Sequence, residues 1–144
     1  MIKIGVIGAG GNTISAHLPK LMAQKDVEVI AVANRTILSG SKVAKKFNIK
    51  HVYGDWQEVV MNDEVDAICI GTWPYMHATI SIEALESGKH VLTEARMAMN
   101  ADEAFRMFNA HQANPKLVAQ VVPSPITLFA DATIKRLISE GYLG

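Results

Sequence analysis

Residues 8–13, Gly8-Ala9-Gly10-Gly11-Asn12-Thr13, decide the fold of this chain. They follow an apolar run and open a segment of helix length, so we expect a strand before them and a helix after them. Gly8 and Gly10 match the start of a G-x-G-x-x-G motif, and Thr13 stands where the motif has its last glycine or alanine. Gly8 permits a tight turn, and Gly10 lets the backbone approach a pyrophosphate, whose charge the helix N-terminus favours. The stretch predicts a dinucleotide-binding turn with contacts from Gly8, Gly10, Gly11, Asn12 and Thr13; the alternative is an ordinary strand-to-helix turn.

Short apolar runs alternate with helix-length segments along the whole chain. Strands are expected at residues 2–7, 27–33, 51–53, 66–70, 90–93 and 117–122, and helices at 12–24, 38–47, 56–61, 76–87, 100–113 and 127–140. Pro19 is expected to kink the first helix or to limit its first turns. Strands without polar alternation that are separated by helices indicate a parallel sheet buried on both faces. The predicted fold is therefore α/β: a Rossmann-type, doubly wound parallel sheet with helices on both faces, in a single domain spanning residues 1–144.

The composition excludes several classes of protein. Among the 144 residues, 49% are hydrophobic and 19% charged, and the formal net charge is zero, so neither a nucleic-acid nor a membrane-surface partner is expected. The only cysteine, Cys69, cannot form an internal disulfide, and the start does not resemble a signal peptide. The five histidines lack the spacing of a metal site. We expect a cytoplasmic protein without a bound metal.

The end of the second strand bears on the choice of cofactor. In NAD-binding domains an acidic residue there holds the ribose hydroxyls. This chain has Ala33-Asn34-Arg35-Thr36 instead, so nothing repels a 2′-phosphate, and Arg35 can pair with that phosphate or stack on adenine. Asn34 and Arg35 therefore favour NADP, with NAD still open; the alternative is a surface loop with one solvated arginine.

Several further stretches form a recognisable pattern together. They are His17-Leu18-Pro19, residues 52–55, residues 64–67, residues 88–94, and the closing helix and glycines at residues 134–144. With the glycine turn, they resemble the N-terminal domain of the Gfo/Idh/MocA family, named for glucose–fructose oxidoreductase, inositol dehydrogenase and rhizopine catabolism. The resemblance implies an NAD(P)-binding domain. In the family a mostly antiparallel sheet domain follows and supplies substrate and often oligomer contacts, and the substrates are usually sugars, polyols or related compounds.

The resemblance also implies cofactor-cleft residues outside the turn. Thr72 and His77 fit the family's T-P-N-x-x-H stretch, and Glu94 fits the start of its E-K-P motif. Trp73 replaces the usual proline and is expected to cover the cofactor or to be a partly buried packing residue. His77 is expected either at the cleft or as a helix-start histidine.

The E-K-P motif reads Glu94-Ala95-Arg96 here. The family's lysine lies at the nicotinamide and the substrate hydroxyl and assists proton transfer, which alanine cannot do. Arginine is a poor acid or base near neutral pH, although Arg96 can orient an anionic substrate. We therefore assign no catalytic residue to this chain.

Three functions follow from this pattern. The first is the NADP-preferring domain of an oxidoreductase that transfers hydride with a sugar, polyol or related carbonyl substrate. The second is a non-catalytic NAD(P)-binding sensor or regulatory module, and the third is a structural domain whose glycine turn is a relic. The family's second domain is expected to be absent, so the isolated chain is expected to be inactive. Self-association as a homo-oligomer, in the form of a dimer, is expected through the last helix and residues 123–129, which include Ile126, Leu128 and Phe129.

Overall fold

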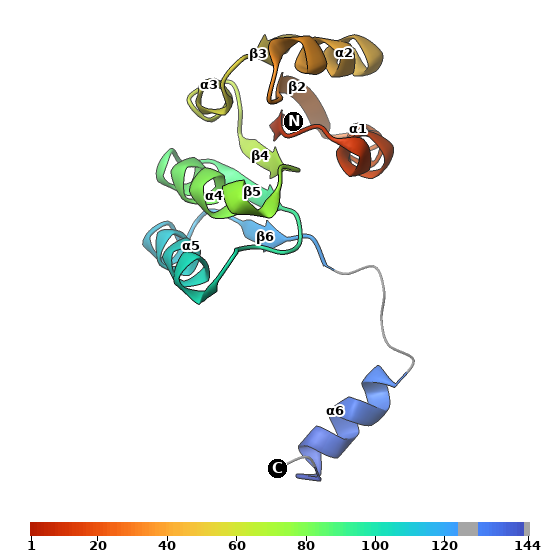
Figure 1. The fold of residues 1–144 in the computed structure, drawn as a ribbon, viewed down its shortest axis with the longest axis vertical. Helices are drawn as coiled ribbons and strands as arrows, with labels where there is room; N and C mark the ends of the chain where they lie inside the picture. The colour runs from red at the N-terminus through yellow and green to blue at the C-terminus, as the bar shows by residue number, and fades with distance from the viewer. Residues whose placement is uncertain (124–129, 143–144) are drawn as a thin grey trace.

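The sheet is six-stranded and parallel throughout. The computed structural model describes residues 1–123 and 130–142. The strands are β1 (Ile2–Ile7), β2 (Val27–Ala33), β3 (His51–Tyr53), β4 (Ala67–Ile70), β5 (His90–Thr93) and β6 (Ala119–Val121). Their order across the sheet is β3-β2-β1-β4-β5-β6, and every neighbouring pair is parallel (Figure 1). The predicted Rossmann-type fold is confirmed, and each expected strand is present.

The helices occupy the expected segments with shifted ends. They are α1 (Leu18–Met22), preceded by a π-helical turn (Thr13–His17), then α2 (Ile37–Phe47), α3 (Trp56–Val60), a 3-10 turn (Pro74–Met76), α4 (His77–Glu86), α5 (Ala101–Ala113) and α6 (Asp131–Ser139). The predicted segment with Ile126, Leu128 and Phe129 lies outside the described residues. Within α6 no residue is buried, and Ile138 is 60% exposed.

Two hydrophobic cores cover the two faces of the sheet. Neighbouring residues of one strand belong to different cores: Val6 packs with Leu18 on one face, and Ile7 packs with Ile80 on the other. Cys69 lies in the core that contains Val6 and Leu18. Burial there raises the pKa of its thiol to about 12, with a smaller contribution from the charge of Glu94. Helices on both faces thus follow from strands that are apolar on both sides.

The strand order places a crevice beside β1. The chain runs from β1 outward to β3 and then returns to β4 on the other side of β1. In open sheets of this kind, ligands bind outside the carboxyl ends of the strands, where the order reverses. The glycine turn after β1 and the loops after β4 and β5 all lie at this edge.

The π-helical turn precedes Pro19. The Leu18 N–H donates to the carbonyl of Thr13, five residues earlier. Proline lacks an N–H, and its ring clashes with the carbonyl four residues before it in a regular α-helix. The wider turn accommodates Pro19, so the irregularity that the sequence predicted takes the form of a π-bulge.

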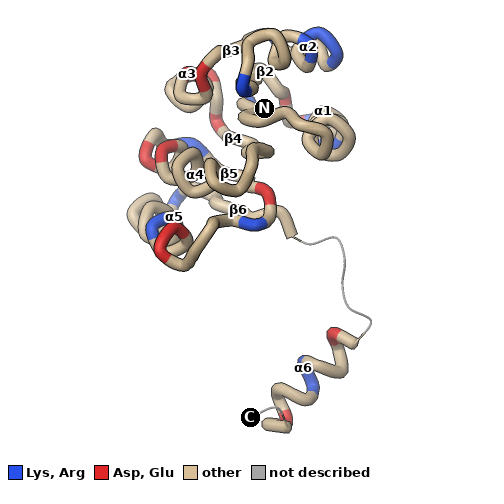
Figure 2. The backbone as a smooth tube through the Cα atoms, viewed as in Figure 1, with Lys and Arg blue, Asp and Glu red and all other residues tan. Residues whose placement is uncertain are grey.

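Charged residues of both signs are spread over the sheet edges and helices of the described chain (Figure 2). None of the helices within residues 1–123 and 130–142 combines the length and apolar character that a membrane span requires.

Candidate cofactor site

Gly8 is required by the backbone of the glycine turn. Its φ is +84°, and its N–H donates to the Ala33 carbonyl at 2.9 Å, which ties the turn to β2. A Cβ atom at Gly8 would lie 2.6 Å from the Thr72 backbone nitrogen. Both the conformation and the close packing against the loop after β4 therefore need glycine here.

Gly10 and Gly11 face open space instead. Neither has a positive φ, and a Cβ atom added to either would meet no atom within 4 Å. The Ile14 N–H makes the first helical bond, to the Gly10 carbonyl at 2.9 Å, so the N–H groups of residues 11–13 precede it and stay available. Nothing in the described fold requires glycine at either position, which fits close approach by a ligand.

Thr13 fills a space that Gly71 leaves. Its side chain is 1% exposed, and its hydroxyl donates to the Gly8 carbonyl at 3.1 Å. A Cβ atom at Gly71 would lie 2.1 Å from Thr13 Oγ1. The sequence placed Thr13 at the motif's last glycine without identifying Gly71 as the partner that makes room for it.

Asn34 couples the end of β2 to the turn. Its Oδ1 accepts from the Ala9 N–H at 2.7 Å. Arg35 follows on the surface and makes no hydrogen bond or ion pair with the described residues, and Thr36 then caps α2 by accepting from the Ser39 N–H. The Arg35 guanidinium is therefore exposed and without a partner among the described residues.

Glu94 joins the first helix to the end of β5. Its Oε1 accepts hydrogen bonds from Asn12 Nδ2 and lies against His17 Nε2, and its Oε2 accepts from the Ala95 N–H at 3.2 Å. Burial is the largest influence on the Glu94 pKa and raises it, but the bond and charge of His17, with the Ala95 and Asn12 bonds, outweigh it and lower the pKa. The sequence named Asn12 and Glu94 separately and missed both their direct hydrogen bond and the contact of His17 with Glu94.

His77 holds two loops together. Its ring is 1% exposed, with Nδ1 2.8 Å from the Arg96 carbonyl oxygen and Nε2 2.9 Å from the Thr72 carbonyl oxygen. A neutral ring donates to one of these oxygens at a time, and a protonated ring donates to both. In this structure His77 therefore fixes the loops after β4 and β5; its predicted contact with the cofactor stays a prediction.

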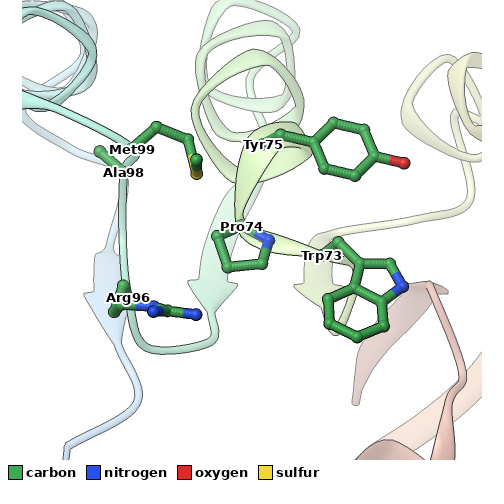
Figure 3. A pocket seen from close by; sticks show the side chains of 6 residues that line it. All are labelled: Trp73, Pro74, Tyr75, Arg96, Ala98 and Met99. Atoms are coloured by element: carbon green, nitrogen blue, oxygen red, sulfur yellow. The ribbon is translucent and has the colours of Figure 1, made fainter.

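Those two loops line an open cavity of about 320 Å³. Its walls are Trp73, Pro74, Tyr75, Arg96, Ala98 and Met99 (Figure 3). Trp73 is 74% exposed and Tyr75 62%, so the indole that the sequence placed near the cofactor is not a buried packing residue. Figure 3 shows the Arg96 side chain extending from one loop toward the Trp73 loop across the cavity.

The turn suits a dinucleotide phosphate in two respects. Open space lies in front of Gly10 and Gly11, and N–H groups of the helix start are available there. No group of three or more His, Cys, Asp or Glu side chains in the described ranges is arranged to hold a metal ion.

Comparison with known proteins gives a consistent result. Residues 2–121 match the Gfo/Idh/MocA oxidoreductase family, NAD-binding Rossmann fold. The chain is 30% identical over 141 residues to glucose-fructose oxidoreductase domain-containing protein 2 of Homo sapiens, covering 98% of this chain and 36% of that protein. It is 28% identical over 156 residues to levoglucosan dehydrogenase of Pseudarthrobacter phenanthrenivorans, covering 99% and 38%.

Among solved structures, a 3-ketoreductase from Actinomadura kijaniata in complex with NADP is similar at a TM-score of 0.81. The two sequences are 26% identical, and the match covers 99% of this chain and 45% of that chain. The chain thus spans less than half the length of each of these three proteins.

Proposed function

This chain belongs to the Gfo/Idh/MocA oxidoreductase family, and we propose that it is the cofactor-binding part of an NADP(H)-preferring oxidoreductase that acts on a sugar, polyol or related carbonyl compound. Relatives named as a levoglucosan dehydrogenase and a 3-ketoreductase support this substrate class. The same names disfavour the alternative of a non-catalytic sensor. Because the chain spans less than half of these relatives, we assign most substrate contacts to a further domain of the kind the family carries.

One observation supports the proposal above the others. Gly10 and Gly11 are glycines that the described fold does not need, and they lie in front of the N–H groups of a helix start. A phosphate group explains both facts, since it needs close backbone approach and N–H donors.

The residues of the site have separable tasks in this proposal. When bound, the nicotinamide supplies the hydride chemistry. Gly8 shapes the turn, Gly10 and Gly11 admit the pyrophosphate, and Asn34 holds the Ala9 backbone in place. Trp73 excludes water from one side of the cleft. The side chain of Ala95 carries no exchangeable proton, so the substrate proton is handled by a group other than residue 95.

NADP preference rests on Asn34 and Arg35. No carboxylate occupies the end of β2, and the Arg35 side chain has no partner within the described residues. A guanidinium binds a phosphate through paired hydrogen bonds. A 2′-phosphate at this place would therefore be attracted and not repelled.

Titration with NADPH and NADH, followed by cofactor fluorescence, tests the proposal. We expect micromolar binding of NADPH, tighter than NADH. Arg35→Ala is expected to weaken NADPH at least about tenfold, about 1.4 kcal/mol, and to leave NADH nearly unchanged. Arg106→Ala, which removes an exposed arginine of α5 paired with Asp102, is the matched control. Equal loss of both cofactors in Arg35→Ala would contradict the assignment to the 2′-phosphate.

Variants of Asn34 separate its role in holding the turn from its role in the preference for the 2′-phosphate. Asn34→Asp keeps an acceptor for the Ala9 N–H but adds a negative charge at the expected 2′-phosphate. We expect it to reverse the preference toward NADH. Asn34→Leu, which removes the acceptor, is expected to weaken both cofactors.

The protein's surroundings complete the proposal. We place it in the cytoplasm, supported by a single cysteine that is buried in the core. We also propose that it forms a homo-oligomer, supported by exposed apolar side chains such as Ile138 of α6 and Phe105 of α5.

A further inference from the structure

We propose that the cavity between the loops after β4 and β5 binds a carboxylate-bearing sugar or polyol, with Arg96 holding the carboxylate and Trp73 stacking on the carbon skeleton. This inference rests on the proposed function, because it names the substrate class of that oxidoreductase. The cavity adjoins the cofactor site, since Trp73 follows Thr72 and Arg96 lies two residues after Glu94.

Charge is the first reason. Arg96 is the only charged residue that lines the cavity, and it forms none of the ion pairs found in the described chain. The nearby carboxylate, Glu94, is already engaged by Asn12, His17 and the Ala95 N–H. An exposed guanidinium without a counter-charge is ready for paired hydrogen bonds to a carboxylate.

The aromatic walls are the second reason. Trp73 and Tyr75 are both mostly exposed, although large aromatic side chains usually bury their rings. The C–H face of a sugar ring stacks on such rings, whereas its hydroxyl groups remain free to reach other donors and acceptors. A volume of about 320 Å³ lies near the lower end of the range for small-molecule sites, which suits a monosaccharide.

The backbones of the two loops are also tied together in the absence of a ligand. His77 Nδ1 contacts the carbonyl of Arg96 and His77 Nε2 contacts that of Thr72, so one buried ring holds both loops. The backbones that carry Trp73 and Arg96 are therefore held in place, which reduces the part of the ordering cost that comes from the loops.

The cofactor's own phosphates have other places in the proposed arrangement. The pyrophosphate is assigned to the open space at Gly10 and Gly11, and the 2′-phosphate to Arg35. Both lie in the turn after β1 or the loop after β2, whereas Arg96 lies in the loop after β5. An anion at Arg96 is thus assigned to the substrate.

Binding of D-glucuronate to the NADPH-saturated chain, followed by calorimetry and by tryptophan fluorescence, tests this inference. D-Glucose and D-glucuronamide serve as neutral probes of similar shape. We expect D-glucuronate to bind at least about tenfold more tightly than either neutral probe. Arg96→Gln is expected to remove this preference and leave NADPH affinity unchanged. The control Arg106→Gln is expected to keep both the preference for D-glucuronate and the NADPH affinity. Trp73→Leu is expected to weaken all three probes.

Three results would overturn the inference: equal affinity for the three probes, an undiminished preference for glucuronate in Arg96→Gln, or loss of NADPH affinity in that variant. The last result would assign Arg96 to the cofactor. Each of them leaves the proposed function standing as long as the unmodified chain binds NADPH. Failure of the unmodified chain to bind NADPH would instead contradict the proposed function.

Discussion

Gly8 and Gly10 belong to the same motif but are glycine for different reasons. Gly8 is demanded by its own φ of +84° and by the Thr72 backbone, whereas Gly10 has room for a side chain. A substitution at Gly8 should therefore affect the folded state, and a substitution at Gly10 should affect the bound state.

We expect Gly8→Ala to lower the free energy of unfolding by about 2 kcal/mol or more, because it adds backbone strain and a close contact. Gly10→Val should leave the unfolding free energy within about 1 kcal/mol and weaken NADPH and NADH alike. Chemical denaturation and cofactor titration measure the two effects. Gly10→Val that binds both cofactors normally would show that the pyrophosphate does not approach this residue.

Glu94 makes the stability of the fold depend on pH at the acidic end. Its pKa lies below its ordinary value of 4.5, so ionised Glu94 stabilises the folded chain above that pH, and this contribution is lost as the pH falls through the lowered pKa. We expect denaturation curves of Glu94→Gln to show a smaller loss of stability on acidification below about pH 4.5 than the unmodified chain. Glu28→Gln, at an exposed position of β2, is the control and should keep the full loss.

At the residue level the sequence predicted local features better than distant ones. Gly8 and Asn34 were identified because the turn motif and the end of β2 have fixed spacings. The contact between His17 and Glu94 joins residues 77 positions apart, and no short pattern reports such a pair. Trp73 was assigned to the cleft from the family resemblance, which could not place its indole on the open wall of a cavity.

At the scale of elements, the packing of the π-helical turn against the loop after β4 depends on Thr13 and Gly71. Gly71→Ala would place a methyl group on Thr13 Oγ1 and 2.7 Å from the Gly8 carbonyl oxygen. We expect it to lower the unfolding free energy by about 1–3 kcal/mol. Thr13→Ala added to Gly71→Ala should restore part of this loss, and only part, because the backbone contact at Gly8 persists.

A double-mutant cycle on these two positions, measured by denaturation, gives the coupling energy directly. Two substitutions at positions that do not touch are expected to change the unfolding free energy additively. Additivity of Thr13→Ala and Gly71→Ala would therefore contradict the contact between the two side chains.

The sequence predicted which segments are helices and which are strands, because the apolar periodicity and the turn residues indicate the same elements along this chain. Asn100 caps α5, because its Oδ1 accepts from the Glu103 N–H at 2.9 Å, and Glu103 Oε2 in turn accepts from the Met99 N–H at 2.9 Å. The π-helical turn before Pro19 did not follow in that form, because proline signals a disruption without specifying how the chain relieves it.

For the molecule as a whole, we expect self-association. Phe105 and Phe108 of α5 are exposed, and Ile134 and Ile138 form an exposed apolar side of α6. Ile138→Lys is expected to lower the apparent molecular mass in sedimentation over a concentration series, because it places a charge in that surface. Ser139→Lys adds the same charge one position along and is the control. A chain that stays monomeric at every concentration would contradict this expectation.

The strand order also has a consequence for the chain during its synthesis. β1 pairs on one side with β4, where Ile4 lies opposite Ala67, so its partner is made about 60 residues later. At about 5–20 residues per second, one edge of this apolar central strand waits roughly 3 to 12 seconds on the ribosome before its neighbour exists. An unpaired edge of that kind is a template for wrong strand pairing. Translation speed across residues 8–67 therefore sets how long the nascent chain stays vulnerable, and slow codons placed there would increase aggregation without changing any amino acid.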